Sequence, residues 1–287
     1  MIKYLLLVYV TNIIYTQSDT IVQIPILDLK KGFNIPGLIP QTKINKTEGL
    51  LSSQIEDIKN TAKKYIPSPI SETDTIVIIT NRGKIKLRYY PEIAPKHCMN
   101  FKKLANSSFY DNTLFHRSIP NFMIQGGDIL SRDIDPENDG LGNPGWSIDA
   151  EFNEISHKRG VLSMARGPDP NSAGSQFFIC VSDAFHLDNK YTAFGEVIEG
   201  MDVIDKIVKS QTNYRLAKNM CKKIIPDGEN LDDWITLRDP KGGMLYTKLP
   251  KYANRDEYVR DMKKKLRSDA PISPQIMKTV RVISATD

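Results

Sequence analysis

The chain has 287 residues, of which 40% are hydrophobic, enough to bury a core in one large domain or two small ones. The formal net charge is only +5, and the segment 211–270, with fourteen Lys/Arg and nine Asp/Glu, accounts for all of it. The sequence has no basic stripe with interleaved aromatic residues, so it does not favour specific nucleic-acid binding. Three cysteines without a CxxC pair (Cys98, Cys180, Cys221) indicate no disulfide framework.

The first 18 residues have the pattern of an export signal. Lys3 supplies a positive start, residues 4–14 form an apolar stretch, and residues 16–18 offer a small-residue cleavage site. The apolar stretch is shorter than the roughly 20 residues that span a bilayer. We therefore predict a cleaved signal peptide over residues 1–18 and a periplasmic or secreted protein. The alternative is an uncleaved segment that tethers the chain to a membrane.

Residues 19–70 are predicted to be an N-terminal extension or linker, because prolines alternate there with polar residues. Only residues 50–62 offer a short helix in this segment. We assign residues 71–287 to one folded domain.

That domain begins with two strands, 75–80 and 84–89, joined by a short loop. In the second strand Ile85, Leu87 and Tyr89 alternate with charged residues, so one face should be buried. Pro95 suits the first turn of a helix that runs to about residue 105. Its predicted inward face is Cys98, Phe101, Leu104 and Ala105.

Further strands are predicted along the rest of the domain, and only one more helix, at 201–208. Many strands with two helices suggest a closed barrel. The strand-like runs are 114–119, 122–125, 161–165, 176–181, 193–197 and 278–283.

Two motifs are the most informative part of the chain. Residues 115–128 have the sequence FHRSIPNFMIQGGD, and residues 173–180 have the sequence AGSQFFIC. Together they resemble the cyclophilins, with aligned positions over about 74–207 and again near 277–283. The resemblance implies a closed eight-stranded antiparallel barrel capped by two helices. It also implies peptidyl-prolyl cis-trans isomerase activity.

The reaction needs no nucleophile, metal or cofactor, because it rotates a peptide bond without breaking it. A catalyst must grip the proline and supply a donor that favours the twisted amide. By the resemblance, Arg117 is the catalytic donor, and a guanidinium offers several fixed N–H groups for this role. The residues that match the proline pocket are Phe122, Met123, Phe178 and Leu187. Those that match contacts to the peptide backbone are Gln125, Gln176 and Ala165.

Three substrate-binding positions differ from the best-known eukaryotic pattern. His186 stands where many members carry a tryptophan that helps to bind cyclosporin, so we expect weak binding of that drug. Tyr191 replaces a histidine of the site. Arg166 replaces an asparagine, and its positive charge could favour acidic residues near the substrate proline.

The segment 211–270 is an insertion before the last strand relative to a minimal cyclophilin. Residues 254–257 resemble a capping box that opens a helix. We interpret its apolar stripe, Tyr258, Val259, Met262 and Leu266, as packing on the barrel wall, with Lys263, Lys264, Lys265 and Arg267 in water. The alternative is a docking surface for a protein partner or an anionic envelope.

Other classes of site are weakly supported. The four histidines have no spacing typical of metal ligands, so we expect neither a metal nor a cofactor. We interpret Asp128, Asp149 and Glu151 as solvated loop residues.

The prediction is therefore a monomeric isomerase that acts on proline-containing polypeptides and assists protein folding outside the cytoplasm. The alternative is a weakly catalytic or non-catalytic module that binds proline-rich segments and docks a partner through 211–270.

Overall fold

The computed structural model describes residues 5–8, 12–17, 20–25 and 49–284. The first three ranges form a small antiparallel sheet of β1 (Leu5–Val8), β2 (Asn12–Gln17) and β3 (Thr20–Pro25). Ser18, at the end of the predicted cleavage site, lies outside the described residues. Residues 26–48 of the predicted extension lie outside them as well. Among the described residues, no helix has both the length and the apolar character needed to cross a lipid bilayer.

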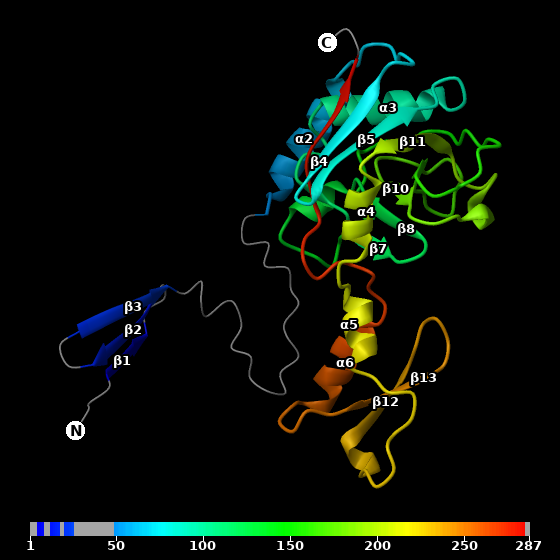
Figure 1. Ribbon diagram of the computed structural model, residues 1–287. Helices are drawn as coiled ribbons and strands as arrows, with labels where there is room; N and C mark the ends of the chain where they lie inside the picture. The colour runs from blue at the N-terminus through cyan, green and yellow to red at the C-terminus, as the bar shows by residue number, and fades with distance from the viewer. Residues whose placement is uncertain (1–4, 9–11, 18–19, 26–48, 285–287) are drawn as a thin grey trace.

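The main body of the protein is one curled antiparallel sheet of nine strand segments (Figure 1). Their order across the sheet is β6-β14-β4-β5-β11-β9-β10-β8-β7. Every predicted strand run contains an observed strand, and the outer ends of the runs differ by at most two residues. The segments are β4 (Thr75–Thr80), β5 (Gly83–Tyr89), β6 (Thr113–Leu114), β7 (Arg117–Ile119), β8 (Met123–Gly126), β9 (Val161–Met164), β10 (Phe177–Cys180), β11 (Ala193–Glu199) and β14 (Ile276–Ile283).

The two outermost strands of this sheet, β6 and β7, are consecutive in the chain. The predicted single strand 114–119 divides here, because Phe115 donates its backbone N–H to Gln275 O and so follows the segment that leads into β14. Ser118, on β7, donates instead to Asp269 O. The mainly β, barrel-like fold is confirmed as a curled sheet of nine segments, and its closure by eight strands stays a prediction.

Alternation along the strands places apolar side chains inside the curl. On β5, Ile85, Leu87 and Tyr89 are buried as predicted, while Arg88 is exposed. Two helices cover this core. Helix α3 (Pro95–Asn106) packs against β11 and β14, and α4 (Met201–Val208) packs against β5, β7 and β8. The predicted inward face of α3 is confirmed, since Cys98, Phe101, Leu104 and Ala105 are fully buried.

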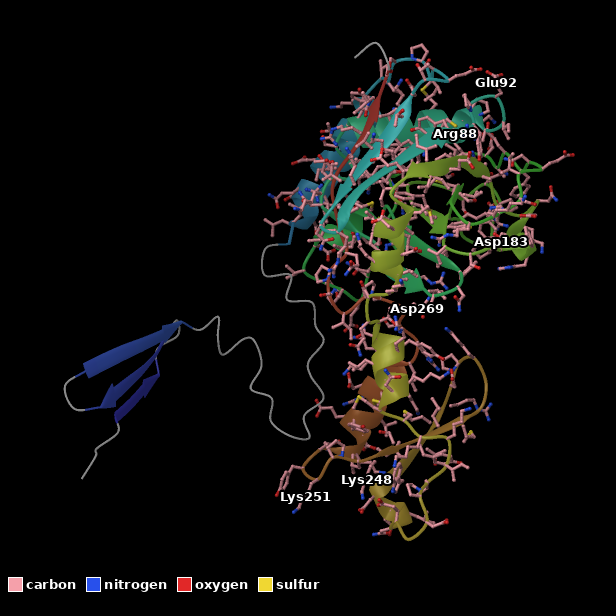
Figure 2. All side chains as sticks on the ribbon, viewed as in Figure 1. Arg88, Glu92, Asp183, Lys248, Lys251 and Asp269 are labelled. Carbon is pink, nitrogen blue, oxygen red and sulfur yellow. The ribbon has the colours of Figure 1, made fainter. Side chains whose placement is uncertain are left out.

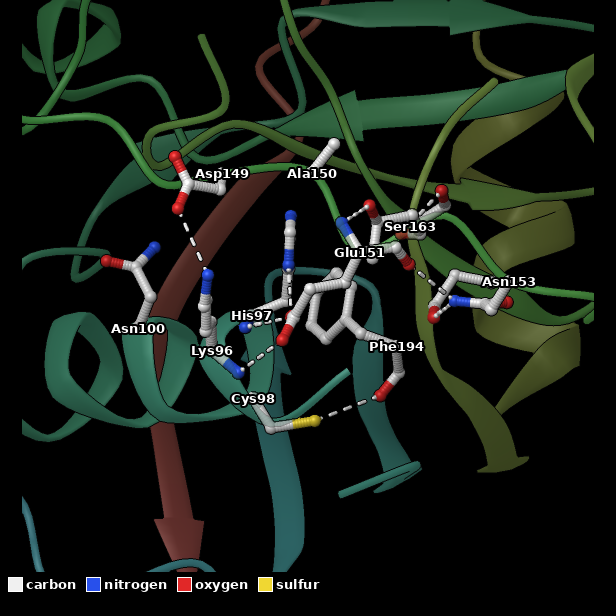
Figure 3. A network of polar contacts seen from close by, with 12 residues as sticks. Lys96, His97, Cys98, Asn100, Asp149, Ala150, Glu151, Asn153, Ser163 and Phe194 are labelled. Atoms are coloured by element: carbon white, nitrogen blue, oxygen red, sulfur yellow. Dashed lines mark hydrogen bonds and ion pairs between the residues drawn. The ribbon is translucent and has the colours of Figure 1, made fainter. Parts of the chain in front are cut away.

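The N-terminus of α3 depends on a carboxylate from a distant loop. Ala94 at the N-cap offers no side-chain acceptor, which would leave the first backbone N–H groups of the helix without partners. Glu151 accepts from the N–H of Lys96 at 3.0 Å and from that of His97 at 2.9 Å (Figure 3). A negative charge there also complements the helix dipole.

This contact corrects one interpretation. Glu151 and Asp128 are structural anchors rather than solvated loop residues. Asp128 is fully buried and accepts from the N–H of Leu130 at 2.8 Å. Only Asp149 of the three acidic residues has the exposed side chain that we expected.

Part of the predicted extension packs against the barrel. Helix α2 (Ser52–Lys64) lies close to the predicted helical run 50–62. Its buried residues Ile55 and Ala62 belong to the same apolar cluster as the interior of the sheet. The chain therefore begins to contribute to the barrel core well before residue 71.

The insertion 211–270 forms a separate small unit below the barrel in Figure 1. Its elements surround an apolar core of their own, which includes Tyr214, Leu237, Tyr258 and Met262. These elements are α5 (Asn213–Asn219), the short helix η3 (Leu231–Asp233), β12 (Trp234–Arg238), β13 (Met244–Lys248) and α6 (Arg255–Lys265).

Two predictions for α6 are wrong. Its apolar stripe packs into the core of the insertion and not onto the barrel wall. Lys265, expected in water, is buried and pairs with Asp261 one turn earlier at 2.8 Å. The predicted helix start is confirmed, since the Asn254 side chain accepts from the N–H of Glu257 at 3.1 Å.

Candidate functional site

Three neighbouring strands bring the main predicted site residues into one row. Arg117 on β7 stands opposite Gln125 on β8, and Gln125 stands opposite Phe178 on β10. Residues directly opposite each other on adjacent strands project to the same face of a sheet. The row therefore places a cation, an amide and an aromatic ring side by side on the outer face.

The Arg117 side chain is 46% exposed and has contacts on two edges of its guanidinium group. Nη1 donates to Gln125 Oε1 at 3.4 Å, and Nε lies 3.8 Å from Asp269 Oδ2. Within the part of the chain that the structure describes, Nη2 has no hydrogen-bond partner. The row therefore presents an always-charged donor group, the Arg117 guanidinium, to solvent.

A chain of amides fixes the second member of the row. Gln125 Nε2 donates to Gln176 Oε1 at 3.0 Å. Gln176 Nε2 in turn donates to the carbonyl oxygens of Gly140 and Gly142, both at 2.8 Å. Gln125 Oε1 is therefore oriented toward Arg117 by a network that ends on the backbone.

The apolar residues predicted for the site form one cluster, separate from the barrel core. We call it the pocket cluster. The Phe178 and Tyr191 rings meet edge to face with centroids 5.8 Å apart, and His186 lies against Phe122 with centroids 5.4 Å apart. Its buried members are Met123, Phe178, Cys180, Ala184 and Leu187, and its partly buried members are Ile119, Phe122, Ala165 and Tyr191.

A buried polar network supports the pocket cluster from beneath, and sequence reasoning missed it. The His157 ring stacks on Phe178 with centroids 6.0 Å apart. Its Nδ1 lies 2.9 Å from Asp188 Oδ1, and its Nε2 lies 3.0 Å from Ser163 Oγ. Burial lowers the pKa of this imidazole, and the contact with Asp188 offsets only part of that shift. No spacing motif joins these residues in the sequence.

This network has the contacts of a Ser-His-Asp triad but not its accessibility. Ser163 and His157 are fully buried, and Ser163 Oγ donates to Thr192 O at 2.9 Å. A nucleophile must reach its substrate, so the arrangement supports the pocket rather than covalent catalysis.

Burial also raises the pKa of Cys180 to about 12, which keeps this thiol protonated in the pocket wall.

Comparisons with known proteins agree with this geometry. The family model for the cyclophilin-type peptidyl-prolyl cis-trans isomerase matches residues 75–225, just over half of the chain. The chain belongs to the cyclophilin family. A probable peptidyl-prolyl cis-trans isomerase of Brucella abortus is 38% identical over 157 residues, which cover 53% of this chain and 80% of the relative. A peptidyl-prolyl cis-trans isomerase of Acinetobacter baylyi is 40% identical over 150 residues, which cover 50% of this chain and 77% of the relative.

Solved structures show the same fold. A Cryptosporidium parvum cyclophilin-type isomerase superposes with a TM-score of 0.50 and 27% identity, covering 73% of this chain and 99% of that one. That structure was determined in the presence of the dipeptide Ala-Pro. The present chain is accordingly a peptidyl-prolyl cis-trans isomerase with a cyclophilin barrel.

Two of the positions that depart from the common cyclophilin pattern contact each other. The guanidinium of Arg166 lies over the Tyr191 ring, 4.7 Å from its centroid. It also donates to Lys190 O, at 2.8 Å from Nη2, and to Gly167 O, at 2.9 Å from Nη1. Arg166 thus holds the rim of the pocket together, and its predicted preference for acidic residues near proline stays a prediction.

Metal binding has no geometric support in the described ranges. No three or more His, Cys, Asp or Glu side chains gather there as metal ligands would. His97 instead contacts Glu151 beneath the start of α3, with 2.7 Å between Nδ1 and Oε2.

Proposed function

We propose that Arg117 catalyses the isomerisation, and that the pocket cluster and Gln125 hold the substrate proline and its backbone. The observation that carries this proposal is the row of Arg117, Gln125 and Phe178 on one face of three strands. It sets a cationic donor beside the apolar residues of the pocket cluster. The substrates are proline-containing polypeptides, in keeping with the Ala-Pro dipeptide used with the Cryptosporidium relative.

The chemistry follows from the electronic structure of the amide. Rotation about the bond before proline costs roughly 18–20 kcal/mol because resonance is lost in the twisted state. The prolyl nitrogen then becomes pyramidal and gains a lone pair that can accept a hydrogen bond. Arg117 Nη2 would donate to this nitrogen or to the neighbouring carbonyl oxygen. Such a contact strengthens on twisting, and only interactions of that kind lower the barrier.

The pocket cluster has a different task. It removes water from the proline ring and holds the ring still, while the rest of the peptide turns about the bond. Met123, Phe178 and Leu187 are packed in place without substrate, and the partly buried Phe122, Ala165 and Tyr191 supply the surface open to a ligand, so this surface is preformed. A preformed apolar surface binds with little cost in side-chain ordering.

The test is the exchange between cis and trans forms of a short Ala-Pro peptide, followed by NMR. Without enzyme the exchange takes tens to hundreds of seconds. We expect acceleration by the wild type and a loss of about 100-fold in the Arg117→Ala variant, the effect of removing one oriented donor. Full activity in that variant would refute the role of Arg117. A lack of acceleration by the wild type would support the binding-module alternative.

We also propose that the enzyme is exported and assists folding outside the cytoplasm. The support is the pattern of the first 18 residues: a positive start, an apolar stretch and a small-residue site. Fusion of residues 1–25 to a reporter that is active only outside the cytoplasm tests this in a bacterial host. We expect reporter activity, and its loss when Leu5, Leu6 and Leu7 are replaced by Asp. An inactive first fusion would contradict export.

A further inference from the structure

The insertion reaches the catalytic site through a single acidic residue. Asp269 belongs to the last residues of the insertion 211–270, and Figure 2 shows it at the junction with the barrel. Its carboxylate Oδ2 lies 3.8 Å from Nε of Arg117. The Asp269 side chain is only 19% exposed, so solvent screens this pair less than it would screen a fully exposed one.

The backbone around Asp269 is held from both sides. On the barrel side, Ser118 donates its N–H to Asp269 O at 3.0 Å, and Ser118 directly follows Arg117 on β7. On the insertion side, the N–H groups of Tyr214 and Asn213, in the first turn of α5, donate to Ser268 O at 2.8 Å and Ala270 O at 3.1 Å. The position of the carboxylate therefore depends on the fold of the insertion as well as on the barrel.

The three edges of the Arg117 guanidinium have different neighbours. Asp269 lies on the Nε edge, and Gln125 accepts from Nη1. Nη2 is left for a substrate, as far as the described residues go. One hydrogen-bond acceptor and one ion-pair partner on two edges favour one orientation of the group. A long arginine side chain would otherwise sample many rotamers on the open face of the sheet.

We propose that Asp269 is a positioning residue for the isomerase reaction, through which the insertion orients the guanidinium of Arg117. This inference rests on the proposed role of Arg117. Asp269 does not touch the substrate in this account. It acts by holding the donor in the direction that the twisted amide requires, which lowers the reorganisation needed at the transition state.

The inference predicts a particular kinetic signature. Asp269→Asn removes the charge and keeps the size of the side chain and the backbone hydrogen bond from Ser118. We expect kcat to fall about two- to fivefold, the scale of a partly exposed ion pair, with KM changed by less than about twofold. The effect should be confined to kcat because the oriented donor is used in the twisted state and not in ground-state binding.

Glu137→Gln is the matched control. Glu137 pairs with Lys264, so it also links the barrel to the insertion, but it has no contact with Arg117. The substitution removes the same charge at the same junction. If loosening of the junction were enough to lower kcat, the two variants would behave alike, and the inference would be overturned.

A second readout reports directly on the arginine. The Nε–H resonance of Arg117 in a nitrogen–proton NMR spectrum should shift in Asp269→Asn and stay in place in Glu137→Gln. Asp269→Glu, which restores the charge, should recover part of the lost kcat. An unchanged kcat, or a rise in KM alone, in Asp269→Asn would overturn the inference. An inactive wild type would instead count against the proposed function, so the two failures are distinguishable.

Discussion

Phe177 and Phe178 are neighbours on β10, yet they belong to the two opposite faces of the sheet. Phe177 lies inside the curl, where its ring meets those of Phe101 and Tyr110 with centroids 5.2 Å and 5.6 Å away. Phe178 lies on the outer face and packs with Tyr191 and His157 in the pocket cluster. Both rings are buried. The alternation of a strand thus places one aromatic ring in the barrel core and the next in the proposed substrate site.

The largest effect that we expect is a loss of stability when the ring inside the curl is removed. Phe177→Ala should lower the free energy of unfolding by about 3–5 kcal/mol, because it leaves a cavity among close-packed rings. Denaturant unfolding of the variant and the wild type measures the difference. Phe178→Ala should cost less stability, since the pocket cluster is smaller and partly open to solvent. Equal losses in the two variants would contradict the division between the faces.

Phe178→Ala tests the same comparison through catalysis. Phe178 is only 5% exposed, so its loss acts chiefly by leaving a cavity in the pocket wall; a cost of about 2 kcal/mol to transition-state binding would lower kcat/KM about 30-fold. Phe178→Leu keeps an apolar side chain and should retain most of the activity. Both variants are assayed under conditions where they remain folded. A Phe178→Ala enzyme with wild-type kcat/KM would exclude the outer face as the proline site.

The two faces also differ in how far the sequence predicted them. The pocket residues were predicted because the motif gives each one a matching position, and the structure does bring them together. Interior residues such as Ile85 and Leu87 were predicted from strand alternation alone. In both cases the relevant signal is local, either a short motif or a period of two.

What the sequence could not show depends on contacts between distant segments. The apolar stripe on α6 indicates that one face of the helix is buried, but it does not identify the elements that cover this face. Met262 was therefore assigned to the barrel wall instead of the core of the insertion. The β12–β13 hairpin could have been found, because the turn residues Pro240, Gly242 and Gly243 separate two short runs with alternating apolar residues. His157 and Asp188, or Arg117 and Asp269, carry no such signal.

Arginine chemistry on the outer face provides the third test. Arg117→Lys keeps the positive charge but replaces a planar fork by a single ammonium group, which cannot contact Gln125, Asp269 and the substrate in fixed directions. We expect kcat/KM to fall about tenfold, or about 1.4 kcal/mol, with unfolding free energy changed by less than about 0.5 kcal/mol. A lysine enzyme as active as the wild type would show that charge alone is sufficient.

The smallest expected effect concerns pH and returns to the support of Phe178. His157 has its pKa lowered from the ordinary value of 6.5, chiefly by burial, so the folded protein binds fewer protons than the unfolded chain below that pH. His97, buried beside Glu151, is shifted in the same direction, again chiefly by burial. Stability should therefore fall as the pH drops below about 6.5, because acid then favours the state that binds more protons.

One proton changes the unfolding free energy by at most about 1.4 kcal/mol per pH unit, and Asp188 opposes the effect of burial, so the slope from His157 is a fraction of that. Unfolding free energies of the wild type and His157→Gln between pH 7 and 5 measure it. The variant should show a shallower slope, and adding His97→Gln should reduce the slope further. If isomerase activity falls with pH in parallel with stability in the wild type but not in His157→Gln, protonation beneath Phe178 disturbs the pocket itself. A slope that is unchanged in both variants would mean that neither buried histidine makes the unfolding free energy depend on pH.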